Sequence, residues 1–82
     1  MQKYIETDTL EPYRALANAI ILEAVKDYRK ALKKLSKYPD AADALAEKDR
    51  CERFFRSEWY GVLTTVDGEM LIGKLQKEVQ CP

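Results

Sequence analysis

The residues of this chain that could recognise a ligand are concentrated between Cys51 and Tyr60. This stretch, Cys51-Glu52-Arg53-Phe54-Phe55-Arg56-Ser57-Glu58-Trp59-Tyr60, contains both phenylalanines and the single tryptophan of the sequence. Arginines beside aromatic rings can hold a phosphate and stack on a base, and the same residue types are enriched in protein interfaces. We therefore predict a binding surface formed by Arg53, Phe54, Arg56 and Tyr60.

A structural role for the two arginines is the alternative. Asp49 precedes Arg53 by four residues, and Glu52 precedes Arg56 by four residues, which is the spacing of stabilising ion pairs on an exposed helix flank. In that case the arginines serve the fold and only the rings remain for binding.

A second candidate surface is a row of lysines at helical spacing, of which we assign Lys26, Lys30 and Lys33 to binding. Residues 22–38 carry six basic and two acidic residues. A lysine row is commonly a solvated helix face, but it also complements an acidic partner.

Several kinds of chemistry lack their usual residues. The chain has no histidine, and its two cysteines, Cys51 and Cys81, are far apart in the sequence. Catalytic triads with histidine, zinc sites, phosphate-binding glycine loops and dinucleotide-binding turns are therefore not expected. The sequence predicts two reduced thiols, no metal, no cofactor and no enzymatic activity.

Length and charge set further limits. With 82 residues the chain forms one domain with a small core. Its 14 basic and 14 acidic residues balance, which argues against general binding of nucleic acids. Neither a signal-peptide pattern nor an apolar run long enough to cross a bilayer occurs, so we expect a cytoplasmic protein without a membrane contact.

Apolar spacing and helix-capping residues predict an all-α fold of three helices. A long helix is expected over residues 10–36, a second over residues 41–63 after Pro39, and a third over residues 68–79 with Asp67 as its N-cap. The buried stripe of the second helix would consist of Leu45, Cys51, Phe55, Trp59 and Val62. Residues 1–9 are predicted as an N-terminal arm and residues 10–80 as a single helical domain.

Residues 15–25 of the long helix are apolar nearly all the way round. Two sides of this segment must therefore be covered. The second side could pack on another subunit, which would give a homo-oligomer through this helix, or the other two helices could cover both sides.

The second and third predicted helices, with the turn at residues 64–68, also resemble a helix-turn-helix. The outward side of the third helix is chemically poor for reading DNA, because it has no arginine and carries acidic groups. We therefore keep DNA binding as the less favoured alternative. The outward residues are Glu69, Gly73, Lys74, Gln76, Lys77 and Glu78.

Four blocks of the sequence resemble a group of small proteins encoded by phages and prophages of Gram-positive, clostridia-like bacteria. The blocks are Ala15-Leu16-Ala17-Asn18-Ala19-Ile20-Ile21, Val25-Lys26-Asp27-Tyr28-Arg29-Lys30-Ala31-Leu32, Cys51-Glu52-Arg53-Phe54-Phe55-Arg56-Ser57-Glu58-Trp59-Tyr60 and Leu63-Thr64-Thr65-Val66-Asp67-Gly68-Glu69-Met70-Leu71-Ile72. The resemblance implies a phage setting and no catalytic residues. It leads us to expect a non-catalytic protein that inhibits or sequesters a host factor, with a host protein or a small nucleotide as its ligand.

Overall fold

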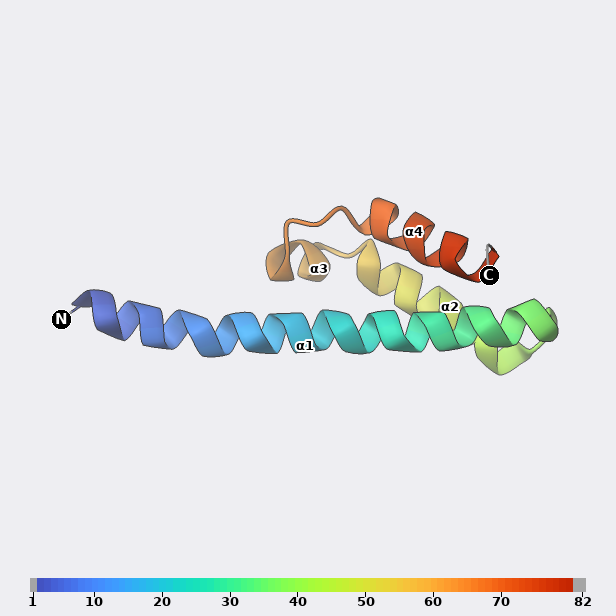
Figure 1. Ribbon diagram of the computed structural model, residues 1–82, viewed down its shortest axis with the longest axis horizontal. Helices are drawn as coiled ribbons and strands as arrows, with labels where there is room; N and C mark the ends of the chain where they lie inside the picture. Colours follow the sequence, from blue (N-terminus) through green and yellow to red (C-terminus); the bar gives the residue numbers. More distant parts are fainter. Residues whose placement is uncertain (1, 81–82) are drawn as a thin grey trace.

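The chain folds into four α-helices, of which the first is much the longest (Figure 1). The computed structural model describes the backbone of residues 2–80 and the side chains of residues 13–79. The helices are α1 (Gln2–Lys37), α2 (Ala42–Phe55), α3 (Glu58–Leu63) and α4 (Gly68–Gln80). Residues 2–80 contain no strand, which confirms the predicted all-α class with a long N-terminal helix. Cys81, predicted as a reduced thiol, lies outside the described residues.

Helices α2, α3 and α4 pack along one side of α1 (Figure 1). The chain reverses after α1, so that α2 runs antiparallel to it; α4 then returns in the direction of α1. The most extensive packing joins α1 to α2, followed by α1 to α4. The molecule measures 56 × 23 × 18 Å, and the N-terminal part of α1 extends beyond the other helices.

Only the C-terminal end of α1 lies where the sequence predicts it. It stops at Lys37, as expected from Pro39, which disfavours helical geometry in the residue before it. It begins at Gln2 rather than near Leu10, so residues 2–9 of the predicted arm are helical; Met1 lies outside the described residues. Residues 2–9 contain no glycine or proline that would end the helix, and Pro12 lies inside α1 although proline is unfavourable in a helix interior.

The single helix predicted over residues 41–63 is wrong, because the chain breaks between α2 and α3. Ser57 adopts extended backbone angles, φ −80° and ψ 160°. Its Oγ accepts a hydrogen bond from the Tyr60 backbone N–H at 3.1 Å and donates one to the Phe54 carbonyl at 2.6 Å. A serine that satisfies backbone groups in this way ends one helix and caps the next.

The core lies where α1, α2, α3 and α4 meet. Tyr28, Phe55 and Leu75 are its largest fully buried side chains. The remaining buried residues of this cluster are Val25, Leu32, Cys51, Tyr60 and Ile72. Each helix therefore contributes to one apolar cluster, which is what holds three short helices on the long one.

The turn into α4 depends on Gly68. A Cβ built at this position would overlap the carbonyl oxygen of Phe55 and would touch the Tyr60 ring at 3.5 Å. Asp67 Oδ1 accepts a hydrogen bond from the Glu69 N–H at 2.9 Å, which confirms Asp67 as the N-cap of α4. The positive end of the α4 dipole thus meets the negative C-terminal end of α2 at the closest approach of the two helices.

Replacement of Gly68 by alanine should destabilise the fold, whereas replacement of Gly73 should not. In Gly68→Ala the added methyl group must displace the Phe55 carbonyl, at a cost of about 1–3 kcal/mol in the free energy of unfolding. Gly73 lies inside α4 with open space around it, so Gly73→Ala should add about 0.5–1 kcal/mol of stability. Urea unfolding followed by circular dichroism measures both, and equal effects would contradict the close approach at Gly68.

Candidate functional site

Trp59 and Tyr60 occupy environments opposite to those predicted. Leu45 of the predicted buried stripe is 47% exposed, because it lies about 120° around α2 from Cys51. Trp59 and Val62 were assigned to the same stripe but are 54% and 74% exposed, whereas Tyr60 was assigned to the binding surface but is 3% exposed. The physical reason is the break at Ser57, which changes the helical phase. Residues after the break do not continue the stripe that Cys51 and Phe55 form in α2.

Phe54, which was assigned to the binding surface, is partly buried and packs against the core. The Phe54 ring centroid lies 5.6 Å from that of Phe55 and 5.7 Å from that of Tyr60, the latter pair being edge to face. The Phe55 and Tyr60 centroids are 5.8 Å apart, so each of the three rings contacts the other two, and such aromatic pairs are stabilising. The outer side of Phe54 borders an open groove of about 490 Å³, lined also by Ala19, Ile20, Glu23, Ala24 and Asp27.

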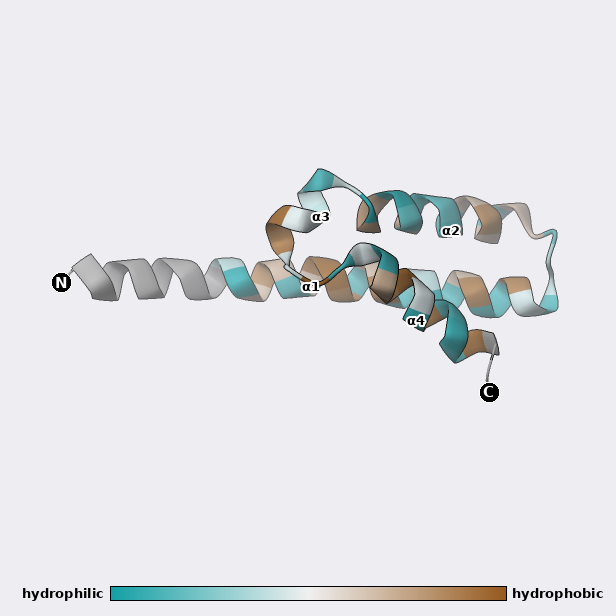
Figure 2. Cartoon of the chain, turned by 90° about the horizontal axis from the view of Figure 1, so that it is seen from above, coloured by the Kyte–Doolittle hydropathy of each residue, from teal (hydrophilic) through white to brown (hydrophobic). Residues whose placement is uncertain are grey.

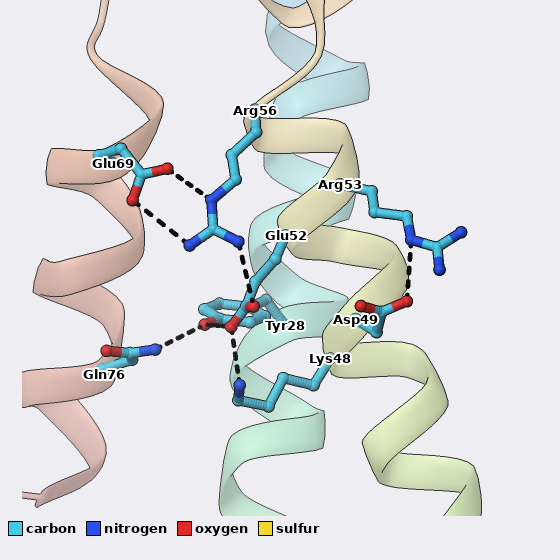
Figure 3. Close-up of polar contacts among 8 residues, drawn as sticks. All are labelled: Tyr28, Lys48, Asp49, Glu52, Arg53, Arg56, Glu69 and Gln76. Atoms are coloured by element: carbon cyan, nitrogen blue, oxygen red, sulfur yellow. Dashed lines mark hydrogen bonds and ion pairs between the residues drawn. The ribbon is translucent and has the colours of Figure 1, made fainter.

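The two arginines of the predicted surface form the ion pairs that their spacing suggests (Figure 3). Arg53 Nε lies 2.9 Å from Asp49 Oδ2, and Arg56 lies 3.6 Å from Glu52. Arg56 also binds Glu69 and thereby joins α2 to α4. The Arg53 side chain is 81% exposed, so of the two arginines it is the one that a partner can readily reach.

A polar network in the core connects α1, α2 and α4 (Figure 3). Its centre is Tyr28, which is fully buried. The Tyr28 hydroxyl donates a hydrogen bond to Glu52 at 2.6 Å and accepts one from the Gln76 amide at 3.1 Å. Lys48 Nζ lies 2.9 Å from the same Glu52 carboxylate. The spacing of residues along the sequence did not indicate this network, because its members come from three different helices.

The pKa shifts in the network are those of a structural site. Burial, with the hydrogen bond to Glu52 next, raises the pKa of Tyr28 far above its ordinary value. Burial acts to raise the pKa of Glu52 as well, but hydrogen bonds from Tyr28 and Lys48 and the charges of Lys48 and Arg56 outweigh it and lower that pKa. Tyr28 therefore stays neutral and Glu52 stays ionised near neutral pH, so neither group is poised for proton transfer.

Cys51 is equally unsuited to chemistry. It is buried, and its thiol lies 3.6 Å from Glu47 Oε2. Burial, followed by this hydrogen bond, raises the pKa of the Cys51 thiol to about 12. The thiol is therefore protonated at neutral pH and a poor nucleophile.

The lysines of the second predicted surface are all exposed on α1. Among the described residues no ion pair includes Lys26, Lys30 or Lys33. Their neighbour Lys34 instead pairs with Asp43 of α2 at 2.6 Å, and Arg29 pairs with Glu78 of α4 at 2.8 Å. The basic half of α1 is thus only partly neutralised by the helices that pack on it.

The sequence reasoning missed an exposed apolar surface around α3. We define the α3–α4 apolar surface as Trp59, Val62, Val66 and Met70, all of which are large apolar side chains about half exposed or more. Val62 also borders a second groove of about 310 Å³ beside Tyr13 of α1. A serine at position 57, immediately after the periodic stretch, was the signal that could have indicated a new helix and this change of face.

The other helices leave one side of the apolar first half of α1 exposed. The alternative that the other two helices cover both sides of residues 15–25 is therefore wrong. Tyr13, Leu16 and Leu22 are 64%, 57% and 65% exposed. Figure 2 shows the hydrophobic part of this segment next to α3.

Half of the outward residues assigned to DNA reading are used inside the molecule. Glu69 binds Arg56, Gln76 binds Tyr28, and Glu78 binds Arg29. These contacts hold α4 against α1 and α2, so this helix does not present a free outward face at those positions.

Neither a metal site nor a membrane-spanning helix is found in the described part of the chain. Between residues 13 and 79 no group of three or more histidine, cysteine or acidic side chains could hold a metal ion. None of the helices described combines the length and the apolar character needed to cross a membrane. Comparisons of the chain with protein-family models, with curated proteins and with solved structures give no match.

Removal of the hydroxyl groups of Tyr28 and Tyr60 should have opposite effects. Tyr28→Phe deletes a hydrogen bond to a charged carboxylate and should lower the free energy of unfolding by about 1.5–3 kcal/mol. The Tyr60 hydroxyl is buried without a hydrogen-bond partner among the described residues. Tyr60→Phe should therefore raise the free energy of unfolding by about 1 kcal/mol. Urea unfolding of both variants tests the pair, and a loss of stability in Tyr60→Phe would contradict the assigned environment.

Acid should weaken the fold through Glu52. Because its pKa in the folded protein is below its ordinary value of 4.5, its stabilising contribution is present above that pH and is lost as the pH falls through the folded-state pKa. Unfolding of the natural chain and of Glu52→Gln should therefore differ most at about pH 7 and least at about pH 3. A difference that stays constant over this range would contradict a lowered pKa.

Proposed function

We propose that this chain is a small non-catalytic binding protein that acts by stoichiometric contact with a host protein and inhibits it. The α3–α4 apolar surface carries the proposal. Trp59 and Val62 are 54% and 74% exposed, although Tyr60 of the same helix is buried. Burial of exposed apolar side chains by a partner lowers the free energy of the complex. Tryptophan is among the commonest anchors of protein interfaces.

A protein partner has more support than a nucleotide. Recognition of a nucleotide by the predicted surface needs an accessible ring beside arginines, but Tyr60 is buried and Arg56 contacts two carboxylates. Arg53 remains available, and an exposed arginine at the rim of an apolar surface adds hydrogen bonds to a protein interface. The resemblance to phage-encoded proteins supplies the setting, in which the partner is a factor of the bacterial host.

Binding without catalysis is supported by the titratable groups. The directions of the pKa shifts at Tyr28, Cys51 and Glu52 all strengthen the ionisation state that each group ordinarily has near neutral pH. General acid–base catalysis needs a pKa moved toward the working pH. The alternative, a helix-turn-helix regulator of phage genes, has less support because Glu69, Gln76 and Glu78 of α4 are held by intramolecular contacts.

Loss of the apolar anchors should abolish capture of the partner. A double variant, Trp59→Ala with Val62→Ala, should bind the partner at least about thirtyfold more weakly, because loss of even one hot-spot side chain costs about 2 kcal/mol or more. The partner is first captured from a lysate of a clostridia-like host with the natural chain, then purified and titrated calorimetrically against each variant. Inhibition of the partner's own activity should be lost in parallel.

Tyr38→Ala is the matched control, since Tyr38 is 62% exposed but lies in the connection between α1 and α2, at the end of the molecule away from α3 (Figure 1). It should bind as the natural chain does. Equal binding by the double variant, or a steeply salt-dependent gel shift with phage operator DNA in place of protein capture, would overturn the proposal.

A further inference from the structure

The charges of α1 are distributed unevenly along its length. Residues 2–23 hold four acidic and two basic residues, whereas residues 24–37 hold six basic and one acidic residue. Two such helices side by side in the same direction would place like charges together. In opposite directions they would place the acidic half of each beside the basic half of the other, which is favourable.

An exposed row of residues follows the side of α1 away from the core. We define this outward stripe as Ala15, Ala19, Leu22, Lys26, Lys30 and Lys33. Its members recur every three or four residues, as positions on one helix face do, and all are exposed. Its apolar part has no cover, and its lysines take part in no ion pair among the described residues. Continued toward the N-terminus at the same spacing, these positions include that of Asp8.

We propose that the outward stripe binds a second copy of this chain, with the two α1 helices antiparallel. When Ala15 lies opposite Ala19 of the partner subunit, Lys26 lies opposite Asp8 of the partner subunit, because both pairs are centred on position 17. The arrangement has two-fold symmetry, so every such contact occurs twice. The small side chains at the centre allow the helix axes to approach closely, and Leu22 and Leu16 become covered on either side.

This dimer is independent of the proposed host partner. The stripe lies on the side of α1 opposite to Tyr28 and the core, whereas α3 packs on the core side. The α3–α4 apolar surface therefore stays accessible in the dimer, and each copy carries its own site. Loss of dimerisation would therefore leave binding of the host partner unchanged.

A zero-length carbodiimide cross-linker tests the geometry in a mixture of normal and isotope-labelled chains. Light scattering should give twice the chain mass of 9.5 kDa, and links between Lys26 and Asp8 should join labelled to normal chains. Within one helix these residues are about 27 Å apart, at 1.5 Å per residue, so an intramolecular link cannot form. A monomer at all concentrations overturns the proposal, as does a dimer whose links show parallel α1 helices or a different face.

Charge reversal tests the pairing by a second route. Lys26→Asp and Asp8→Lys should each raise the dissociation constant of the dimer about tenfold or more, and the combined variant should restore it. Lys74→Asp on the exposed part of α4 is the control and should leave dimerisation unchanged. Unchanged helix content by circular dichroism shows that each variant is folded. Failure of the combined variant to recover affinity overturns the assigned register.

Discussion

The hydroxyl of Tyr28 is the point at which three of the four helices are held in register. A buried hydroxyl without partners costs about 1–3 kcal/mol, and here Glu52 of α2 and Gln76 of α4 satisfy it. Glu52 in turn needs cations, which Lys48 and Arg56 provide. Sliding α2 or α4 along α1 would leave at least one of these groups buried and unpaired, so the network selects one arrangement of an otherwise generic apolar core.

The surface of the molecule follows from a second constraint, the capping of α3 by Ser57. Because Ser57 satisfies the Tyr60 backbone N–H, the chain turns before the helix can continue, and the face that was buried in α2 is replaced by another. Tyr60 enters the core beside Phe55, at 5.8 Å between ring centroids, and Trp59 is left in water. The hydroxyl group of Ser57 thus determines that Tyr60 is buried in the core and that Trp59 is exposed to a partner.

The two proposed interfaces consist of side chains that the core and its ion pairs do not use. The carboxylates of α2 and α4 pair with Arg29, Lys34, Lys48 and Arg56, whereas the lysines of the outward stripe form no ion pair among the described residues. The apolar surface around α3 lies on the packed side. A chain with a small core can in this way place self-association and partner binding on opposite sides of one long helix.

The sequence alone determined the features that depend on near neighbours along the chain. The length of α1 beyond Tyr13, its end before Pro39, the cap at Asp67 and the pair between Asp49 and Arg53 all involve residues within a few positions of one another, where spacing is sufficient evidence. The tertiary structure decided the rest. Tyr28 and Glu52 are 24 positions apart, and the exchange of Trp59 and Tyr60 between core and surface depends on how the chain packs after Ser57. Contacts between distant segments carry no periodic signal, because their free energy depends on which helices meet and not on the order of residues within one helix.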